Sequence, residues 1–176
     1  MGPCQMGNTL MKPAIFAGCL AAGLILTLPG LAFAGATVKV SLWDKGPDSV
    51  VLDDAHMAMM GKMDMAMASK GMMGVKVDKT SVKAGTVTFV VKNDSKDIIH
   101  EMILSPVADG VVELPYLKDE NRVDEEKAGH LGEVAELDPG KSGKLTVDVK
   151  PGKYILYCNI PAHFVDGMWT EITVTK

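Results

Sequence analysis

The sequence predicts an all-β fold in which two sheets pack face to face as a sandwich. From residue 74 onward, short runs of alternating or β-branched apolar residues recur along the chain. Turn signals separate these runs, among them Asp138-Pro139-Gly140 and Pro151-Gly152. The chain has 176 residues, which is enough for one domain with a substantial core and too few for two. Short strands at this spacing are typical of a sandwich whose facing sheets bury alternate residues.

The first 34 residues have the features of a secretory signal peptide. Lys12 is the only charged residue before Lys39, and a short apolar run follows it at residues 14–28. Ala32 and Ala34 then place small side chains at the two positions that a signal peptidase reads. The run is too short and wrongly flanked for a membrane anchor. We therefore expect residues 1–34 to be removed and the mature protein to lie in the periplasm without an anchor.

Residues 35–73 are expected to join one strand to a methionine-rich segment. Residues 37–42 alternate apolar and polar side chains, as a half-buried strand does. Residues 55–73 contain eight methionines but no Leu, Ile or Val, a composition found nowhere else in the chain. The chain therefore divides into a signal peptide, an N-terminal segment at 35–73 and a main domain at 74–176.

The strands of the main domain follow one another closely. They are expected at residues 75–77, 86–92, 98–104, 145–149, 153–157 and 170–175. Each is a short β-branched or alternating run, and turn residues lie between the runs. The charged stretch 118–127 interrupts the series. Its interleaved acids and bases predict a surface loop or a single exposed helix.

Charge and cysteine content narrow the range of functions. The formal net charge is −4, which gives no basis for binding nucleic acid, since that requires clustered Lys and Arg. Cys4 and Cys19 leave with the signal peptide, so Cys158 remains alone in an oxidising compartment. An unpaired thiol there is prone to wrong disulfides, and coordination to a metal removes that reactivity. A buried inert thiol is the alternative explanation.

The segment after the expected strand 153–157 brings three kinds of metal ligand into one loop. Cys158, His163 and Met168 follow one another at intervals of five residues. A loop can fold three such side chains around one point, whereas a straight strand would spread them along its length. His100, at the edge of the expected strand 98–104, is the best candidate for a fourth ligand. Two imidazoles, one thiolate and a weakly bound thioether form the ligand set of a type 1 copper centre.

Copper suits this ligand set better than zinc does. Thiolate and thioether favour Cu(I), and imidazole accepts both Cu(I) and Cu(II). Zinc also binds Cys and His but has little use for a thioether, so Met168 argues for copper. Taken singly, Met168 is explained as a core residue and His100 as a buried histidine. Taken together with the sole mature cysteine and the loop spacing, the residues are better explained as a copper site.

The segment from Cys158 to Met168 resembles the copper loop of the cupredoxins, the family of azurin, plastocyanin and rusticyanin. Its Cys-x4-His-x4-Met spacing, with Pro161 before the histidine and Gly167 before the methionine, is most similar to rusticyanin and sulfocyanin. Residues 132–137 and 151–154 are also similar to the strands that lead into this loop. The resemblance implies a Greek-key sandwich, the cupredoxin fold, over roughly the last hundred residues.

The resemblance also implies roles for individual residues. The four copper ligands would be His100, Cys158, His163 and Met168. The residues around the thiolate would be Glu101, Asn159 and Ile160. The backbone N–H groups of Glu101 and Ile160 would donate hydrogen bonds to the sulfur, and such bonds tune the reduction potential. Many cupredoxins have Asn or Ser in the place of Glu101, and that side chain ties the two ligand loops together.

Apolar residues surround the second histidine of the loop. They are Pro161, Ala162, Phe164, Val165 and Trp169. In cupredoxins the edge of the equivalent histidine passes through an apolar patch where redox partners dock. Two interpretations stay open here. The patch would receive a periplasmic redox partner or a copper-handling protein near His163, or the same residues would simply pack the loop.

The methionine-rich segment is expected to capture further Cu(I). Its candidate ligands are His56, Met57, Met59, Met60, Met63, Met65 and Met67. Thioethers are soft and insensitive to pH, which suits Cu(I) where thiols are scarce. The alternative is a helix that packs four of these methionines as an apolar stripe. Met57 and Met65 fall off that face, and a core helix has no reason to avoid leucine.

Copper binding in the periplasm for copper tolerance is the function that the sequence favours. The chain resembles small periplasmic copper-tolerance proteins that join a methionine-rich segment to a cupredoxin domain. A small soluble electron carrier is the alternative, with copper alternating between Cu(I) and Cu(II). An enzyme is not expected. Copper oxidases and reductases add copper sites that His-x-His or His-Cys-His patterns announce, and this chain has four histidines and neither pattern.

Overall fold

The computed structural model describes residues 1–2, 35–46, 71–108 and 114–176. Residues 3–34, which contain most of the expected signal peptide, lie outside the described residues, as do residues 47–70. Ala34–Lys176 forms one compact unit.

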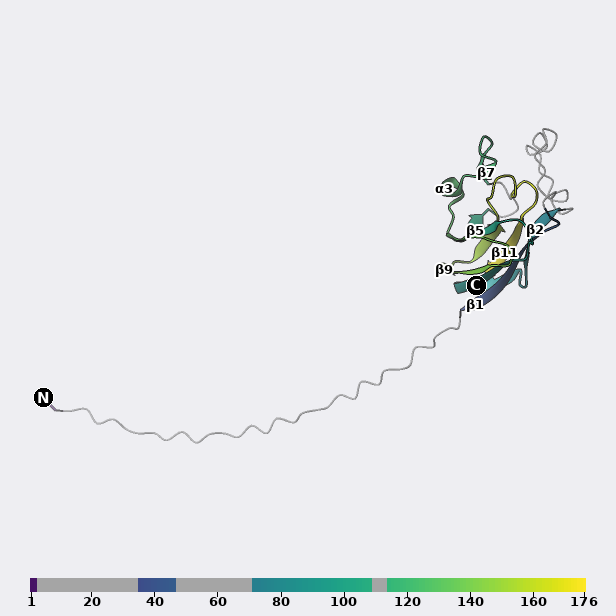
Figure 1. Cartoon of the computed structure of the whole chain (residues 1–176). Coiled ribbons are helices and arrows are strands. Elements are labelled where there is room, and N and C mark those ends of the chain that lie inside the picture. Colours follow the sequence, from purple (N-terminus) through teal and green to yellow (C-terminus); the bar gives the residue numbers. More distant parts are fainter. Residues whose placement is uncertain (3–34, 47–70, 109–113) are drawn as a thin grey trace. The chain divides into compact units, whose positions relative to one another are not determined.

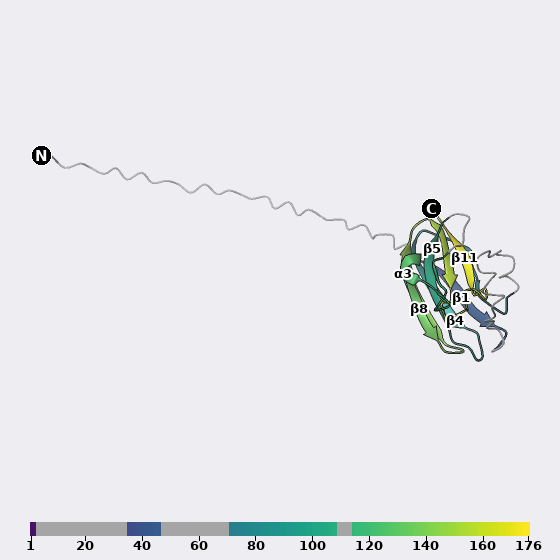
Figure 2. The same cartoon turned by 90° about the horizontal axis from the view of Figure 1, so that it is seen from above.

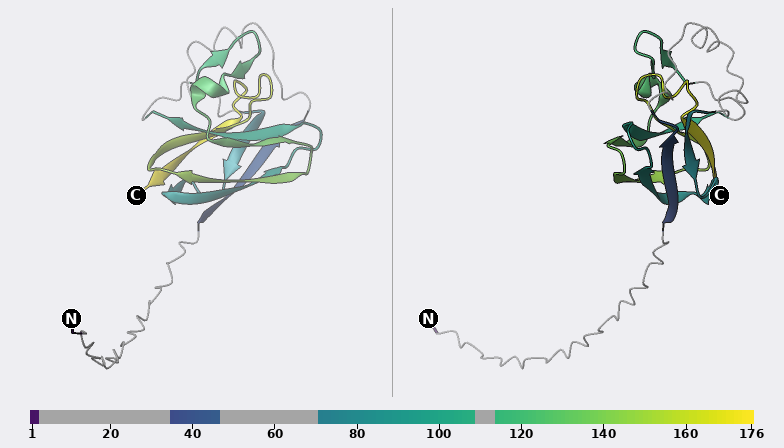
Figure 3. Two further views of the ribbon diagram at one scale, coloured as in Figure 1. Left: turned by 90° about the vertical axis from the view of Figure 1, so that its left-hand side faces the viewer. Right: turned by 45° about the vertical axis from the view of Figure 1, so that its right-hand side comes forward.

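Two sheets form a sandwich (Figures 1 and 3). The four-stranded sheet has the order β2-β1-β4-β9, with strands β1 (Ala36–Asp44), β2 (Met73–Val77), β4 (Gly85–Asn93) and β9 (Ser142–Val149). The five-stranded sheet has the order β3-β11-β10-β5-β8, with strands β3 (Ser81–Lys83), β5 (His100–Val107), β8 (Gly132–Leu137), β10 (Gly152–Tyr157) and β11 (Trp169–Thr175). The predicted all-β sandwich is confirmed.

Strand β1 is an interior strand of the four-stranded sheet. It runs parallel to β4, with Leu42 opposite Asn93, and antiparallel to β2, with Asp44 opposite Met73. The strand that the sequence placed in a separate N-terminal segment is therefore part of the sandwich. Its last residue, Asp44, lies where the chain leaves the sheet, and Met73 lies where the chain returns.

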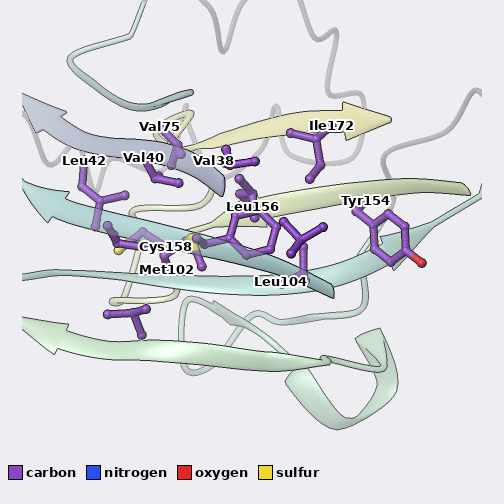
Figure 4. Packing of buried hydrophobic residues seen from close by; sticks show 14 of the residues in the cluster. Val38, Val40, Leu42, Val75, Met102, Leu104, Tyr154, Leu156, Cys158 and Ile172 are labelled. Atoms are coloured by element: carbon purple, nitrogen blue, oxygen red, sulfur yellow. The ribbon is translucent and has the colours of Figure 1, made fainter. Parts of the chain in front are cut away.

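The main core fills the space between the two sheets (Figure 4). Alternate residues of β1, namely Val38, Val40 and Leu42, are at most 3% exposed and face this space. The facing side chains from the other sheet include Met102, Leu104, Tyr154, Leu156 and Ile172. Cys158 and Met168 belong to the same buried cluster. The two sulfur-bearing residues of the loop thus lie at the border of the core, where water is excluded.

A second apolar cluster covers the outer face of the five-stranded sheet. Ile103, Ile155 and Tyr157 are fully buried on that face, although they alternate with residues of the main core. Strands β5 and β10 therefore read as nearly continuous apolar runs, because both of their faces are covered. The covering residues from outside the sheet are Val123, Ala128, Ala162, Phe164 and Val165.

The charged stretch 118–127 folds as a hairpin and a single helical turn. Strands β6 (Tyr116–Leu117) and β7 (Arg122–Val123) pair antiparallel, and α3 (Glu125–Ala128) follows. Figures 1 and 2 show α3 at one end of the sandwich, and Figure 1 shows β7 beside the loop between β10 and β11. The prediction of a surface loop or a single exposed helix was incomplete. Val123, within the stretch, and Ala128, directly after it, are buried in the second cluster. In the part of the chain described here, no helix is long and apolar enough to cross a bilayer.

Candidate metal centre

His100 is the first residue of β5, and a hydrogen-bonded loop holds it in place. The side chain of Asn93 donates to the carbonyl oxygens of Ile98 (2.9 Å) and Leu137 (2.8 Å). The Ser95 hydroxyl accepts hydrogen bonds from the backbone N–H groups of Asp97 and Ile98. The pairing of β5 with β8 also shifts register directly after His100. These contacts fix the direction in which the buried ring of His100 points.

One nitrogen of His100 is bonded to a buried carboxylate. Nε2 of His100 lies 2.8 Å from Oδ2 of Asp44, the last residue of β1. The side chains of His100 and Asp44 are 0% and 2% exposed. This contact leaves Nδ1 as the nitrogen of His100 that faces the rest of the site.

The loop between β10 and β11 is closed by its own backbone. Cys158 N–H donates to the carbonyl oxygen of Met168 (3.0 Å), and Met168 N–H donates to that of His163 (3.0 Å). Gly167 has φ of 91° and Ala162 has φ of 73°, so two positions of the loop adopt the left-handed conformation. Ala162 pays a steric penalty there, and its N–H donates to the carbonyl oxygen of Asn121 (2.8 Å). The three sulfur- and nitrogen-bearing residues of the loop are thereby held around one point.

The structure brings Cys158, His100 and His163 together. Nδ1 of His163 lies 3.3 Å from Sγ of Cys158 and 3.3 Å from Nδ1 of His100. One donor atom from each residue lies within 4.8 Å of the others, and all three residues are buried. Met168, which is 0% exposed, packs in the same cluster as Cys158. Residues 63 positions apart in the chain therefore meet at a single buried point.

The electrostatics of the cluster favour neutral imidazoles and a protonated thiol. Burial, together with the neighbouring His100, lowers the pKa of His163 to about 4. Burial also lowers the pKa of His100, against the opposing effect of Asp44. Burial raises the pKa of Cys158, hydrogen bonds from the backbone of Glu101 and Ile160 offset only part of that rise, and the resulting pKa is about 12. The thiol therefore needs a nearby cation to ionise at neutral pH.

Glu101 links the two segments that carry the cluster. Its backbone N–H lies 3.4 Å from Sγ of Cys158, and its Oε1 accepts a hydrogen bond of 3.0 Å from the backbone N–H of Asn159. The carboxyl group thus makes the kind of inter-loop tie that Asn or Ser provides in many cupredoxins. Burial, followed by repulsion from other acids, raises the pKa of Glu101 to about 7 despite the bond from Asn159.

Asn159 ties the loop to the hairpin outside the sheet. Its side chain accepts from Val123 N–H (2.6 Å) and donates to the Val123 carbonyl oxygen (3.0 Å) and to Glu125 Oε1 (2.7 Å). With Glu101 on one side and Val123 on the other, the residue after Cys158 is held from two directions. Such outer contacts keep metal ligands in position whether or not a metal is bound.

The apolar residues around His163 pack the loop. Ala162, Phe164 and Val165 are 0%, 4% and 7% exposed and belong to the second cluster. The ring of Phe164 packs edge-on against Tyr157, with centroids 5.7 Å apart. His163 itself is 2% exposed, and Pro161 is the exposed residue beside it. The sequence left open whether these apolar residues form a docking patch or pack the loop, and the burial of these three residues describes packing.

The family of the chain follows from the comparison with family models. Residues 61–175 match the model of the copper-binding proteins of the plastocyanin/azurin family. The chain is a cupredoxin of that family. The match covers both sheets except β1, and it includes His100, Cys158, His163 and Met168 of this cupredoxin. No curated protein matches the sequence.

Solved structures of rusticyanin and auracyanin are similar to this cupredoxin. A methionine-to-leucine variant of rusticyanin has a TM-score of 0.50 at 17% identity, over 81% of this chain and 79% of that one. Rusticyanin from Thiobacillus ferrooxidans has a TM-score of 0.48 at 16% identity, over 79% of this chain and 76% of that one. Auracyanin from Roseiflexus castenholzii has a TM-score of 0.43 at 25% identity, over 57% of this chain and 87% of that one.

The residues of the buried cluster fit the copper that this family binds. Two imidazole nitrogens and one sulfur lie within 4.8 Å of one another, and a soft cation between them would be bound by all three. His100, Cys158 and His163 could therefore hold a copper ion. Burial of all three excludes water as a competing ligand.

Sequence reasoning missed Asp44 and the loop residues that support His100. A signal for Asp44 was present, because Val38, Val40, Leu42 and Asp44 share one parity along a strand. An acidic residue on the same face of a strand as its buried apolar residues needs a hydrogen-bond partner in the interior. The candidate Cu(I) ligands from His56 to Met67 lie outside the described residues.

Proposed function

We propose that this cupredoxin holds one copper ion as a type 1 centre. His100, Cys158 and His163 are its principal ligands, and Met168 is the weak axial ligand. The convergence of one donor atom from each of the first three residues within 4.8 Å is the observation that carries the proposal. The backbone bonds of Met168 to Cys158 and His163 support the fourth assignment. Copper bound to such a set accepts or releases one electron.

The residues of this chain suit a site that changes little between oxidation states. The loop is held by its own backbone bonds, by Glu101 and by Asn159, and the ring of His100 is held by Asp44. Fixed ligands reduce the rearrangement that accompanies electron transfer. The Glu101 N–H donates toward the sulfur and stabilises negative charge there.

For the cell, we propose that the protein binds copper in the periplasm and contributes to copper tolerance. The composition of residues 55–73 supports this role, because a methionine-rich segment in the same chain as a type 1 site adds capacity for Cu(I). The alternative is a small electron carrier. The buried one-electron site favours that reading, and a periplasmic partner would then approach His163 across the exposed Pro161.

Anaerobic titration of residues 35–176 with Cu(I) tests both parts. The proposal expects one ion at the buried cluster and additional ions that Met→Leu changes at positions 57 to 67 abolish. One ion in total would favour the electron carrier. A Cys158→Ser variant must lose the intense thiolate-to-Cu(II) absorption. Retention of that band would refute the assignment of the ligands.

A gene deletion separates the two cellular roles. Copper tolerance predicts growth that becomes sensitive to added copper and recovers with the wild-type gene. Unchanged copper sensitivity together with a blocked respiratory chain would replace this role with electron carriage.

A further inference from the structure

Asp44 is a carboxylate buried at the edge of the core. Its side chain is 2% exposed, and it continues the inward-facing series Val38, Val40 and Leu42 of β1. An isolated buried charge is costly, so a carboxylate persists in such a place only with donors around it. Asp44 lies outside residues 61–175, the part of the chain that matches the family model.

Three groups surround the carboxylate of Asp44. His100 Nε2 lies 2.8 Å from Oδ2, and Gly46 N–H donates to Oδ1 at 2.7 Å. The Ser95 side chain also donates to it. Both oxygens of the carboxylate therefore face hydrogen-bond donors. This arrangement suits an ionised carboxylate, because that form only accepts hydrogen bonds.

An ionised carboxylate decides which nitrogen of His100 carries the proton. A carboxylate only accepts hydrogen bonds, so the nitrogen that faces it must be the N–H nitrogen. A neutral imidazole carries a single proton, so a proton on Nε2 leaves a free lone pair on Nδ1. Nδ1 is the atom that faces His163 at 3.3 Å.

We infer that Asp44 is a positioning residue for the copper centre. Asp44 holds His100 in the Nε2–H form, which turns Nδ1 to the metal, and the negative charge of Asp44 favours Cu(II) over Cu(I). The inference rests on the proposed type 1 centre. A second argument comes from charge. The ionised carboxylate is bonded directly to a ligand in a site shielded from water, where electrostatic interactions are weakly screened. A negative charge there stabilises the ion of higher charge, and it also makes the imidazole a stronger donor.

A purely structural role for Asp44 predicts different results. In that case Asp44 would only fasten the loop through Ser95 and Gly46, and its charge would have no effect on copper. Stability measurements alone cannot separate the two roles, because both predict a less stable variant. The reduction potential and the position of the His100 proton do separate them.

The test compares Asp44→Asn with the control Asp94→Asn in copper-loaded protein. Asn keeps an acceptor for His100 but removes the charge. Asp94, which bonds Ser41 and Lys92 at the surface, loses the same charge without touching the cluster. We expect the thiolate absorption to persist in both variants and the reduction potential to shift to more positive values only in Asp44→Asn. An unshifted potential, or a shift equal to that of Asp94→Asn, would overturn the inference.

A second measurement needs no variant and remains decisive if Asp44→Asn does not fold. Nitrogen-15 NMR of the metal-free and Cu(I)-loaded wild-type protein reports which nitrogen of His100 is protonated. The inference expects protonated Nε2 in both states, and a predominant Nδ1–H form in the metal-free protein would overturn it. A wild-type protein that binds no copper would overturn the proposed centre and the charge effect together. A copper-loaded Asp44→Asn with wild-type potential would overturn this inference alone.

Discussion

The substitution Asn159→Ala should destabilise the metal-free protein severely, although Asn159 is not expected to touch the metal. Its side chain exchanges two hydrogen bonds with the backbone of Val123, a residue that is 1% exposed. Truncation leaves the Val123 N–H without a partner in the interior, which costs about 1–3 kcal/mol. The lost bond to the carbonyl oxygen adds about 0.5–1.5 kcal/mol. The half-exposed Glu125 can turn to water, so its contact adds little.

The expected loss is therefore about 2–4 kcal/mol in the free energy of unfolding. At about 2–4 °C per kcal/mol for a domain of this size, the melting temperature should fall by about 5–15 °C. Thermal unfolding of metal-free protein, followed by circular dichroism, measures it. The control is Glu126→Ala, at an exposed position of α3, the short helix that contains Glu125. It should change the free energy of unfolding by no more than about 0.5 kcal/mol. A loss for Asn159→Ala as small as that of the control would refute the argument from buried hydrogen bonds.

Two further predictions concern the packing of the sheets and the chemistry of metal binding. A Cβ at Gly143 would overlap Cγ1 of Val134 in β8, so Gly143→Ala should lower the free energy of unfolding in urea by about 1–3 kcal/mol. Val134→Ala should restore part of that loss in the double variant, and no recovery would mean that another contact causes it. Because burial raises the pKa of Cys158 to about 12, the first Cu(I) bound at pH 7 should release about one proton from the thiol. Calorimetry in buffers of different ionisation enthalpy counts the protons, and a first ion that releases none would contradict thiolate coordination.

Local patterns in the sequence were sufficient for most of the strands and for most of the copper ligands, although the short strands β3, β6 and β7 were not expected. Residues 37–42 alternate, and β1 buries Val38, Val40 and Leu42 as that alternation requires. The spacing of Cys158, His163 and Met168 lies within one loop, so the sequence could place these residues near one another. His100 was predicted from chemistry rather than from spacing, because a fourth ligand was needed and the chain has only four histidines.

Contacts between distant segments were not accessible in the same way. The many charged residues of 118–127 gave no sign that Val123, or Ala128 directly after them, would be buried. Both residues face inward because the β6–β7 hairpin and α3 pack against the loop between β10 and β11. The same hairpin and helix bury Phe164 and Val165, and the sequence of the loop alone could not predict that burial. Asp44 was missed because its partner His100 lies 56 residues away and is reached only through the parallel pairing of β1 with β4.

A crystal structure of the protein loaded with one equivalent of copper, with anomalous scattering measured at the copper edge, locates the metal directly. We expect one strong anomalous peak within bonding distance of Nδ1 of His100, Sγ of Cys158 and Nδ1 of His163, with Met168 as the fourth neighbour. A copper peak elsewhere in the chain, or one that lacks Cys158 among its ligands, would contradict this expectation.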